Sequence, residues 1–205
     1  NGNNIARLTS AANCVYGQLS SPVWSPDGQS IAFGCGWPNG ERNLCLVESQ
    51  ASGDACPVTN LLEVEKVPPV FCDHRRSEPA TSVWINDISW APDGRQLVFT
   101  CPYPGESRAL VCTLTLADRS ITCWPIALVS GGAEVSGGQV SVDWNPVYAQ
   151  LALALVVKSE ENAKIYLADL DGQNSTFLAK GGAPSWSPDG ERLLFFYQEV
   201  MFLIN

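Results

Sequence analysis

Histidine, methionine and basic residues are scarce in this sequence of 205 residues, which holds one His, one Met and 12 Lys+Arg against 21 Asp+Glu. The formal net charge of −9 disfavours binding to nucleic-acid phosphates and to anionic membrane surfaces, because like charges repel. We therefore expect no nucleic-acid partner. The longest uninterrupted apolar run, Leu151–Val157, is far shorter than the about 20 residues that a membrane-spanning helix requires, so we expect no membrane span.

Closely spaced metal ligands are also lacking. No two of the eight Cys lie closer than ten positions apart, and His74 is the single histidine. Zinc and haem sites need close Cys or His pairs, so we expect no metal and no cofactor. The sequence has no G-x-S-x-G motif and no evident nucleophile partner for His74, so we expect no catalytic residues and no enzyme.

The composition that remains is that of an ordinary globular chain, with 45% hydrophobic and 16% charged residues. The length fits one domain, which we expect to span residues 1–205. An even number of cysteines spread over extended segments indicates disulfides and an oxidising compartment, namely the periplasm, the cell surface or the medium. The chain starts at Asn1 without a basic-then-apolar leader, and we expect that a signal peptide or anchor has been removed.

A turn motif recurs four times. Its tryptophans, Trp24, Trp90, Trp144 and Trp186, are spaced by 66, 54 and 42 residues, and the shortest interval is close to the roughly 40–45 residues of one four-stranded propeller blade. Three copies continue with Pro-Asp-Gly, in which Pro fixes φ and Asp-Gly supplies the positive φ of a tight turn. The third copy has Pro146-Val147-Tyr148 instead, which predicts a looser turn.

Each turn is followed by an apolar run that predicts a β-strand. These runs are Ser30–Gly34, Gln96–Thr100, Gln150–Val157 and Arg192–Tyr197. Two further extended runs follow in the third copy, Lys164–Ala168 and Ser175–Ala179, and the last copy ends with a third run, Val200–Ile204.

The W-S-P-D-G repeat resembles the TolB-type β-propeller repeat family, with about four matching residues in each copy and copies that span most of the chain. The resemblance implies an all-β fold of four-stranded antiparallel blades, with the repeated Trp packed between blades. Members often act as periplasmic or surface domains that bind other proteins, and the fold supports many functions.

We expect a four-bladed β-propeller with blades at about 18–60, 83–128, 139–180 and 183–205 plus 1–10. The last copy lacks a fourth strand, and the segment Asn4–Thr9 precedes the first blade like an outer strand without a blade. We therefore predict that the N-terminal strand closes the last blade and the ring. The alternative is that the chain is a slice of a larger propeller.

Eight cysteines form two sets of four, with final intervals of 10 and 11 residues in the first set and 11 and 11 in the second. The last two cysteines of each set flank a turn, so they can face one another on adjacent antiparallel strands. Repeat symmetry removes most of the other connectivities. We predict four structural disulfides: Cys45–Cys56, Cys112–Cys123, Cys14–Cys35 and Cys72–Cys101.

The loops that join the second strand to the third, and one blade to the next, open on one face of a propeller, and here they are the elaborated ones. The insertion Asn60–Val83 contains a basic trio, and an aromatic residue followed by Pro recurs in two blades. Rigid aromatic residues beside a basic cluster are typical of binding surfaces. The predicted partner-binding residues are Trp37, Phe71, His74, Arg75, Arg76, Trp84 and Tyr103.

Two functions from different classes stay open on this sequence. We favour a non-catalytic extracytoplasmic protein-interaction module or accessory subunit, which binds other proteins of a larger assembly through the loop face of blades one and two. The alternative is a carbohydrate- or ligand-binding propeller, in which Trp37, Trp84 and Tyr103 stack on sugar rings. A polysaccharide-processing enzyme is the less favoured form of that alternative, because it needs two converging carboxylates, for which the candidates are Asp87, Glu134 and Asp143.

Overall fold

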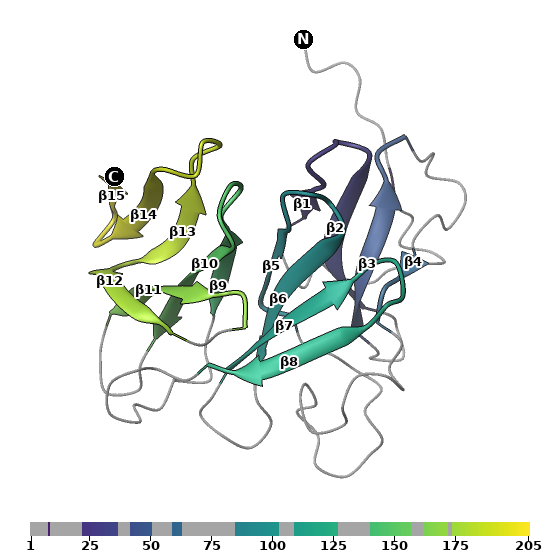
Figure 1. Ribbon diagram of the computed structural model, residues 1–205, viewed down its shortest axis with the longest axis horizontal. Coiled ribbons are helices and arrows are strands. Elements are labelled where there is room, and N and C mark those ends of the chain that lie inside the picture. The colour runs from purple at the N-terminus through teal and green to yellow at the C-terminus, as the bar shows by residue number, and fades with distance from the viewer. Residues whose placement is uncertain are drawn as a thin grey trace.

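The computed structural model describes Leu8 and residues 22–36, 42–50, 59–62, 85–102, 109–126, 140–156, 162–171 and 174–205. Within these residues the regular secondary structure is entirely β-strand, and the strands form four antiparallel sheets (Figure 1). The all-β class predicted from the sequence is therefore confirmed.

The four sheets follow one another along the chain. Sheet one contains β1 (Val23–Trp24), β2 (Ser30–Gly36), β3 (Arg42–Glu48) and β4 (Thr59–Asn60). Sheet two contains β5 (Asp87–Trp90), β6 (Gln96–Pro102), β7 (Ala109–Thr115) and β8 (Ile121–Pro125). Sheet three contains β9 (Ser141–Trp144), β10 (Gln150–Val156), β11 (Ala163–Asp169) and β12 (Thr176–Lys180). Sheet four contains β13 (Gly182–Trp186), β14 (Leu193–Tyr197) and β15 (Val200–Ile204).

The strands predicted after the four repeated turns are present as β2, β6, β10 and β14, and the predicted last strand is β15. Their turns form for the expected local reason. Ser25 Oγ donates to Asp27 Oδ1 at 2.6 Å, the same carboxylate accepts the Gln29 N–H at 3.0 Å, and Gly28 has φ 70°. The Ser25 hydroxyl also lowers the pKa of Asp27, as Ser187 does for Asp189 in the last copy. In the third copy, Asn145 Oδ1 accepts the N–H groups of Val147 and Tyr148, which replaces the Asp-Gly turn.

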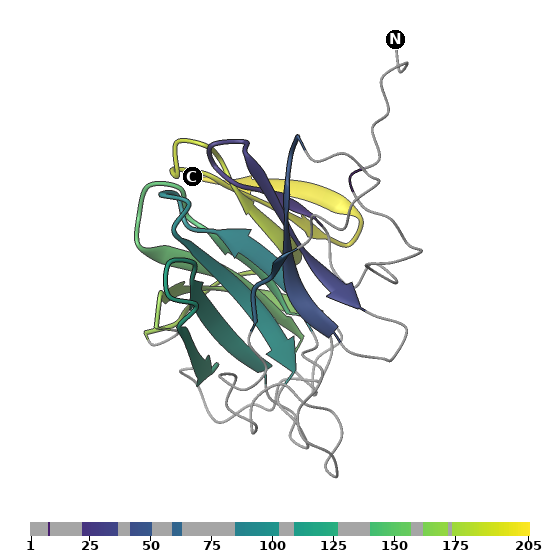
Figure 2. The same ribbon diagram turned by 90° about the vertical axis from the view of Figure 1, so that its right-hand side faces the viewer.

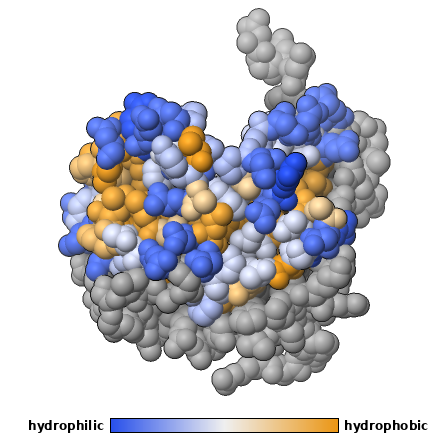
Figure 3. Space-filling model, viewed as in Figure 1, coloured by the Kyte–Doolittle hydropathy of each residue, from blue (hydrophilic) through white to orange (hydrophobic). Residues whose placement is uncertain are grey.

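Each of sheets one to three packs one face on the next sheet in the chain. We call the face on that side of any sheet its leading face and the opposite face its trailing face. The three resulting cores join sheets one and two, two and three, and three and four. Trp90 and Trp144 are buried in the first two cores, as the repeat predicts for a Trp between blades. The sheets form an arc, and the surface is hollowed between sheet four and sheet one (Figures 1 and 3). From the side, β2 and β6 are inclined in the same direction (Figure 2).

Sheet four has three strands where each of the other sheets has four. The segment predicted to supply its fourth strand, Asn4–Thr9, lies outside the described residues apart from Leu8, which belongs to no strand. Closure of a four-bladed ring by that segment therefore stays a prediction.

The disulfides differ in part from the prediction. The structure joins Cys35 to Cys45, with a Cα–Cα distance of 5.9 Å, so the predicted pairs Cys14–Cys35 and Cys45–Cys56 are wrong. The register explains the pairing, because Cys45 lies opposite Phe33 on β2 and is therefore the diagonal neighbour of Cys35. The predicted Cys112–Cys123 bond is present between directly opposite residues of β7 and β8. Cys101 is also disulfide-bonded, but its predicted partner Cys72 lies outside the described residues.

Candidate interaction face

The described residues fix the bases of the loops on which the predicted binding residues lie. All seven candidates are outside the described residues: Trp37, Phe71, His74, Arg75, Arg76, Trp84 and Tyr103. They fall in the segments 37–41, 63–84 and 103–108, each of which leaves and re-enters sheets one and two at the same end of their strands. The residues where these segments attach therefore show how the loop face is supported.

Asn43 on β3 fixes the start of the segment 63–84. Its Nδ2 donates to the Leu62 carbonyl at 2.9 Å, and its Oδ1 accepts the Leu62 N–H at 2.9 Å. Both residues are buried, and Leu61 and Leu62 pack in the core between sheets one and two. One side chain thus satisfies both backbone groups of the residue from which the long segment departs.

Thr100 on β6 holds the residues that follow two of the segments. Its carbonyl accepts the Asn86 N–H at 2.8 Å, just after the segment 63–84. Its Oγ1 donates to the Val140 carbonyl at 2.7 Å, just after the segment 127–139. Thr100 and Val140 are buried, so the return of both segments is fixed against the same strand.

The Cys35–Cys45 disulfide lies at the same end of sheet one. Cys35 lies two residues before the segment 37–41 and opposite Asn43 in the β2–β3 register. Both half-cystines are fully buried. We define the loop-base residues as those that hold the ends of the segments 37–41, 63–84 and 127–139: Cys35, Asn43, Cys45, Leu62, Asn86, Thr100 and Val140. Sequence reasoning missed Asn43 and Thr100, although Asn43 shares a face of β3 with buried Cys45 and Val47, where a polar side chain needs a partner.

Two partly buried carboxylates form a second cluster, on the inner strands β5 and β9. Asp87 Oδ2 accepts the Val142 N–H at 3.0 Å, and Asp143 Oδ2 accepts the Trp186 N–H at 2.7 Å. Ser89 Oγ donates to Asp143 Oδ1 at 3.0 Å and accepts the Trp144 N–H at 3.0 Å. These bonds join sheet two to sheet three and sheet three to sheet four, so both carboxylates act between consecutive sheets.

Burial raises the pKa of both carboxyl groups, and the N–H donors of the neighbouring sheet oppose this increase. The negative charge of Asp143 further raises the pKa of Asp87. The sequence proposed Asp87 and Asp143 as carboxylates of a polysaccharide-processing site. The structure places their oxygens on backbone donors instead, and the third candidate, Glu134, lies outside the described residues.

The raised pKa values predict a pH dependence of stability. From the ordinary value of 3.8 upwards, the folded carboxyls keep protons that the unfolded chain has released, so the free energy of unfolding falls as pH rises through the raised pKa values. The double variant Asp87→Asn/Asp143→Asn loses this contribution. Urea unfolding of both proteins from about pH 3 to about pH 7 measures the difference. The difference in unfolding free energy, variant minus wild type, should rise with pH, and a difference independent of pH contradicts the assignment.

Two classes of site are not found in the described part of the chain. No group of three or more His, Cys, Asp or Glu side chains there could hold a metal ion. No helix among the same residues is long and apolar enough to cross a membrane.

Comparison with known proteins places the chain among β-propellers. No protein family and no curated protein matches the sequence. Among solved structures, it is similar to TolB from Agrobacterium tumefaciens (TM-score 0.53, 14% identity, 84% of this chain and 51% of that one). It is also similar to the β-propeller domain of the Trilobed protease from Pyrococcus furiosus (TM-score 0.52, 15% identity, 90% of this chain and 53% of that one). A third similar structure is a gluconolactonase from Xanthomonas campestris (TM-score 0.54, 12% identity, 89% of this chain and 55% of that one).

At these identities the similarity shows the fold alone, and the chain spans about half the length of the structures that it matches. The matched structures include enzymes as well as TolB. A β-propeller fold of TolB-like type is therefore supported, and the fold by itself selects no activity.

Proposed function

We propose that this chain is a non-catalytic protein-interaction module, an accessory subunit of an assembly outside the cytoplasm, which binds other proteins through the loop face of sheets one and two. The observation that carries the proposal is the set of loop-base residues. Asn43, Thr100 and the Cys35–Cys45 disulfide fix the ends of the elaborated segments on a buried base. Loops with fixed ends lose less conformational entropy on binding, which favours recognition of a partner.

The distribution of cysteines also favours sheets one and two as the part of the molecule that binds a partner. All eight cysteines precede residue 124, and sheets three and four contain none. The described cysteines, Cys35, Cys45, Cys101, Cys112 and Cys123, are all disulfide-bonded. Disulfides of this kind persist in oxidising compartments, which supports a location in the periplasm, at the cell surface or in the medium.

The carboxylate cluster supports a non-catalytic role. A glycosidase needs two carboxylates that face one scissile bond. Asp87 and Asp143 each accept a backbone N–H group from the next sheet, so either carboxylate would have to give up this partly buried hydrogen bond in order to contact a substrate.

Replacement of the basic pair Arg75 and Arg76 by Glu tests the proposal. The Arg75→Glu/Arg76→Glu variant should bind the protein that copurifies with the native chain at least about tenfold more weakly, because charge reversal in a docking surface opposes association. Titration calorimetry or interferometry with the purified partner measures the affinity. The matched control is Arg95→Glu/Arg192→Glu, which reverses two exposed charges on the turns at the opposite end of the sheets. Equal affinity for both variants would remove the basic pair from the binding surface.

A further inference from the structure

The repeated tryptophan is buried in sheets two and three and partly buried in sheet four, each of which follows another sheet, and it is exposed in sheet one, which follows none of the described sheets. Trp90 is 9% exposed and Trp144 is 7% exposed, whereas Trp24 on sheet one is 61% exposed. Trp90 also donates from Nε1 to the Val23 carbonyl of the preceding sheet at 3.1 Å. Trp24 thus presents an apolar ring that its repeat equivalents bury between sheets.

Sheet four ends the arc with an uncovered leading face. Met201 lies opposite Phe196 in the β14–β15 register and is 57% exposed. The three residues at the equivalent position of the earlier sheets are each 0% exposed: Leu44, Val111 and Ile165. Leu203 shares this face of β15 with Met201 and is also 57% exposed. We define the sheet-four face as Leu194, Phe196, Met201 and Leu203.

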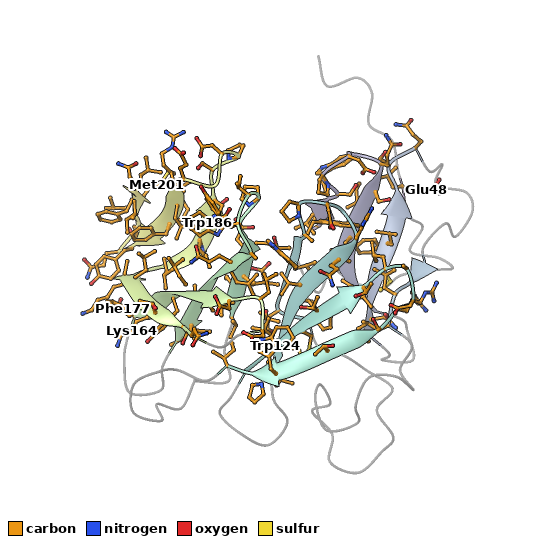
Figure 4. The ribbon with its side chains drawn as sticks, viewed as in Figure 1. Glu48, Trp124, Lys164, Phe177, Trp186 and Met201 are labelled. Atoms are coloured by element: carbon orange, nitrogen blue, oxygen red, sulfur yellow. A yellow bond between two sulfur atoms is a disulfide. The ribbon has the colours of Figure 1, made fainter. Side chains whose placement is uncertain are left out.

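The same interface between consecutive sheets is therefore made three times. At the two ends of the arc, Trp24 on sheet one and the sheet-four face are the two halves of this interface that lack a counterpart among the described sheets. In one chain these halves do not meet, because the hollow between sheet four and sheet one separates them (Figures 1 and 3). Figure 4 shows Met201 at the outer end of sheet four, on the side of the molecule away from sheet one. We propose that the sheet-four face receives Trp24 of a second copy of this chain, in a head-to-tail association.

The chemistry of the two halves fits this occupant. Strand β15 contains no charged residue, so it offers an uncharged contact on a chain whose net charge of −9 otherwise opposes self-association. Exposed apolar patches of this kind are typical of interaction sites. On sheet one, Ile31 and Val47 are already buried, so the contact is made through the protruding Trp24 rather than through the whole trailing face.

The size of Phe196 agrees with a contact through a protruding side chain. The residues at its position in the earlier sheets are small: Gly34, Thr100 and Ala154. Small residues let the next sheet approach closely, whereas Phe196 holds an incoming sheet farther away. The sheets of the two copies are therefore farther apart in this association than neighbouring sheets are within one chain. It involves none of the loop-base residues, and it stands or falls independently of the proposed function.

Sedimentation velocity of the whole chain over a range of concentrations tests the proposal. We expect the wild type to associate, and Trp24→Ser and Met201→Glu each to leave monomer, because each removes one half of the interface. Mixing the two variants should restore a one-to-one pair, because one copy keeps the sheet-four face and the other keeps Trp24. The control is Val147→Glu, which places the same charge at an apolar residue with the same 57% exposure on the β9–β10 turn and should associate like the wild type.

The other outcomes overturn the proposal. Association of the wild type that the mixed variants fail to restore would show that the contact does not join Trp24 to the sheet-four face. A monomeric wild type at every concentration would exclude the second copy. In that monomer, protection of Trp24 from a fluorescence quencher, read as the difference from Trp24→Ser, would indicate closure of the ring within one chain.

Discussion

Replacement of Asn43 by Leu is expected to lower the free energy of unfolding by about 2–5 kcal/mol and to abolish partner binding. The substitution keeps the approximate side-chain volume but leaves the buried N–H and C=O of Leu62 without partners, and each unsatisfied group costs about 1–3 kcal/mol. The segment 63–84 then loses its fixed start. Urea unfolding measures the stability, and the affinity for the copurified partner is measured at a temperature where the variant is folded.

The matched control for this prediction is Asn145→Leu. Asn145 is a buried asparagine that also holds backbone groups, since its Nδ2 donates to the Gly190 carbonyl at 2.9 Å and its Oδ1 accepts two N–H groups. It lies in the repeated turn between β9 and β10, at the end of sheet three opposite to the loop face. We expect a comparable loss of stability with unchanged affinity. A parallel loss of affinity in both variants would mean that stability, and not the base of the loops, controls binding.

Removal of the Cys35–Cys45 disulfide has the second-largest expected effect. The double variant Cys35→Ala/Cys45→Ala should be less stable by about 2–5 kcal/mol, because the cross-link no longer restricts the unfolded chain. It should also bind the partner more weakly, because the segment 37–41 departs from a β2–β3 pair that is no longer covalently joined. Thermal unfolding and the partner titration measure the two effects.

The second disulfide provides the comparison. Cys112–Cys123 closes a sequence separation of 11 residues, against 10 for Cys35–Cys45, but it joins β7 to the outer strand β8, and each of its cysteines lies four residues from the nearest loop segment, whereas Cys35 lies two residues from the segment 37–41. The variant Cys112→Ala/Cys123→Ala should lose a similar amount of stability and keep its affinity. A peptide map without reductant should contain a Cys35–Cys45 linked fragment, and a Cys45–Cys56 fragment would contradict the structure.

The strands and turns could be predicted because their causes are local. Each repeated turn is held by residues within five positions of one another, as in Ser25, Asp27 and Ser30, and an apolar run follows. The same local signals gave the bounds of β15 without error. Packing of Trp90 between sheets followed from the repeat and is observed, whereas Trp24 is exposed because none of the described sheets packs on its side of sheet one.

The disulfide pairing could not be predicted in sheet one because the repeat is not symmetric in register. In sheet two, Cys123 on β8 lies directly opposite Cys112. In sheet one, β4 is only Thr59–Asn60, and Asn60 rather than Cys56 lies opposite Cys45. The intervals Cys45–Cys56 and Cys112–Cys123 are therefore equal in sequence although the strand registers differ, and the register can be read only from the paired strands.

The loop-base residues escaped prediction because their partners are distant in sequence. Asn43 binds a residue 19 positions away and Thr100 a residue 40 positions away. The sequence named Asp87 and Asp143 as candidate carboxylates of a polysaccharide-processing site, and it could not show that both accept backbone N–H groups from the following sheet. Sequence patterns find such polar residues on inward-facing positions and cannot identify what they bind.

Cross-linking mass spectrometry of the native assembly, without reductant, tests the central claim most directly. The chain has four lysines. Lys66 belongs to the segment 63–84, Lys164 and Lys180 lie on β11 and β12 of sheet three, and Lys158 follows β10 in the sequence. Binding through the loop face of sheets one and two predicts that cross-links to another protein originate from Lys66. Cross-links confined to Lys158, Lys164 and Lys180, or a chain isolated without any partner, would contradict the proposed interaction face.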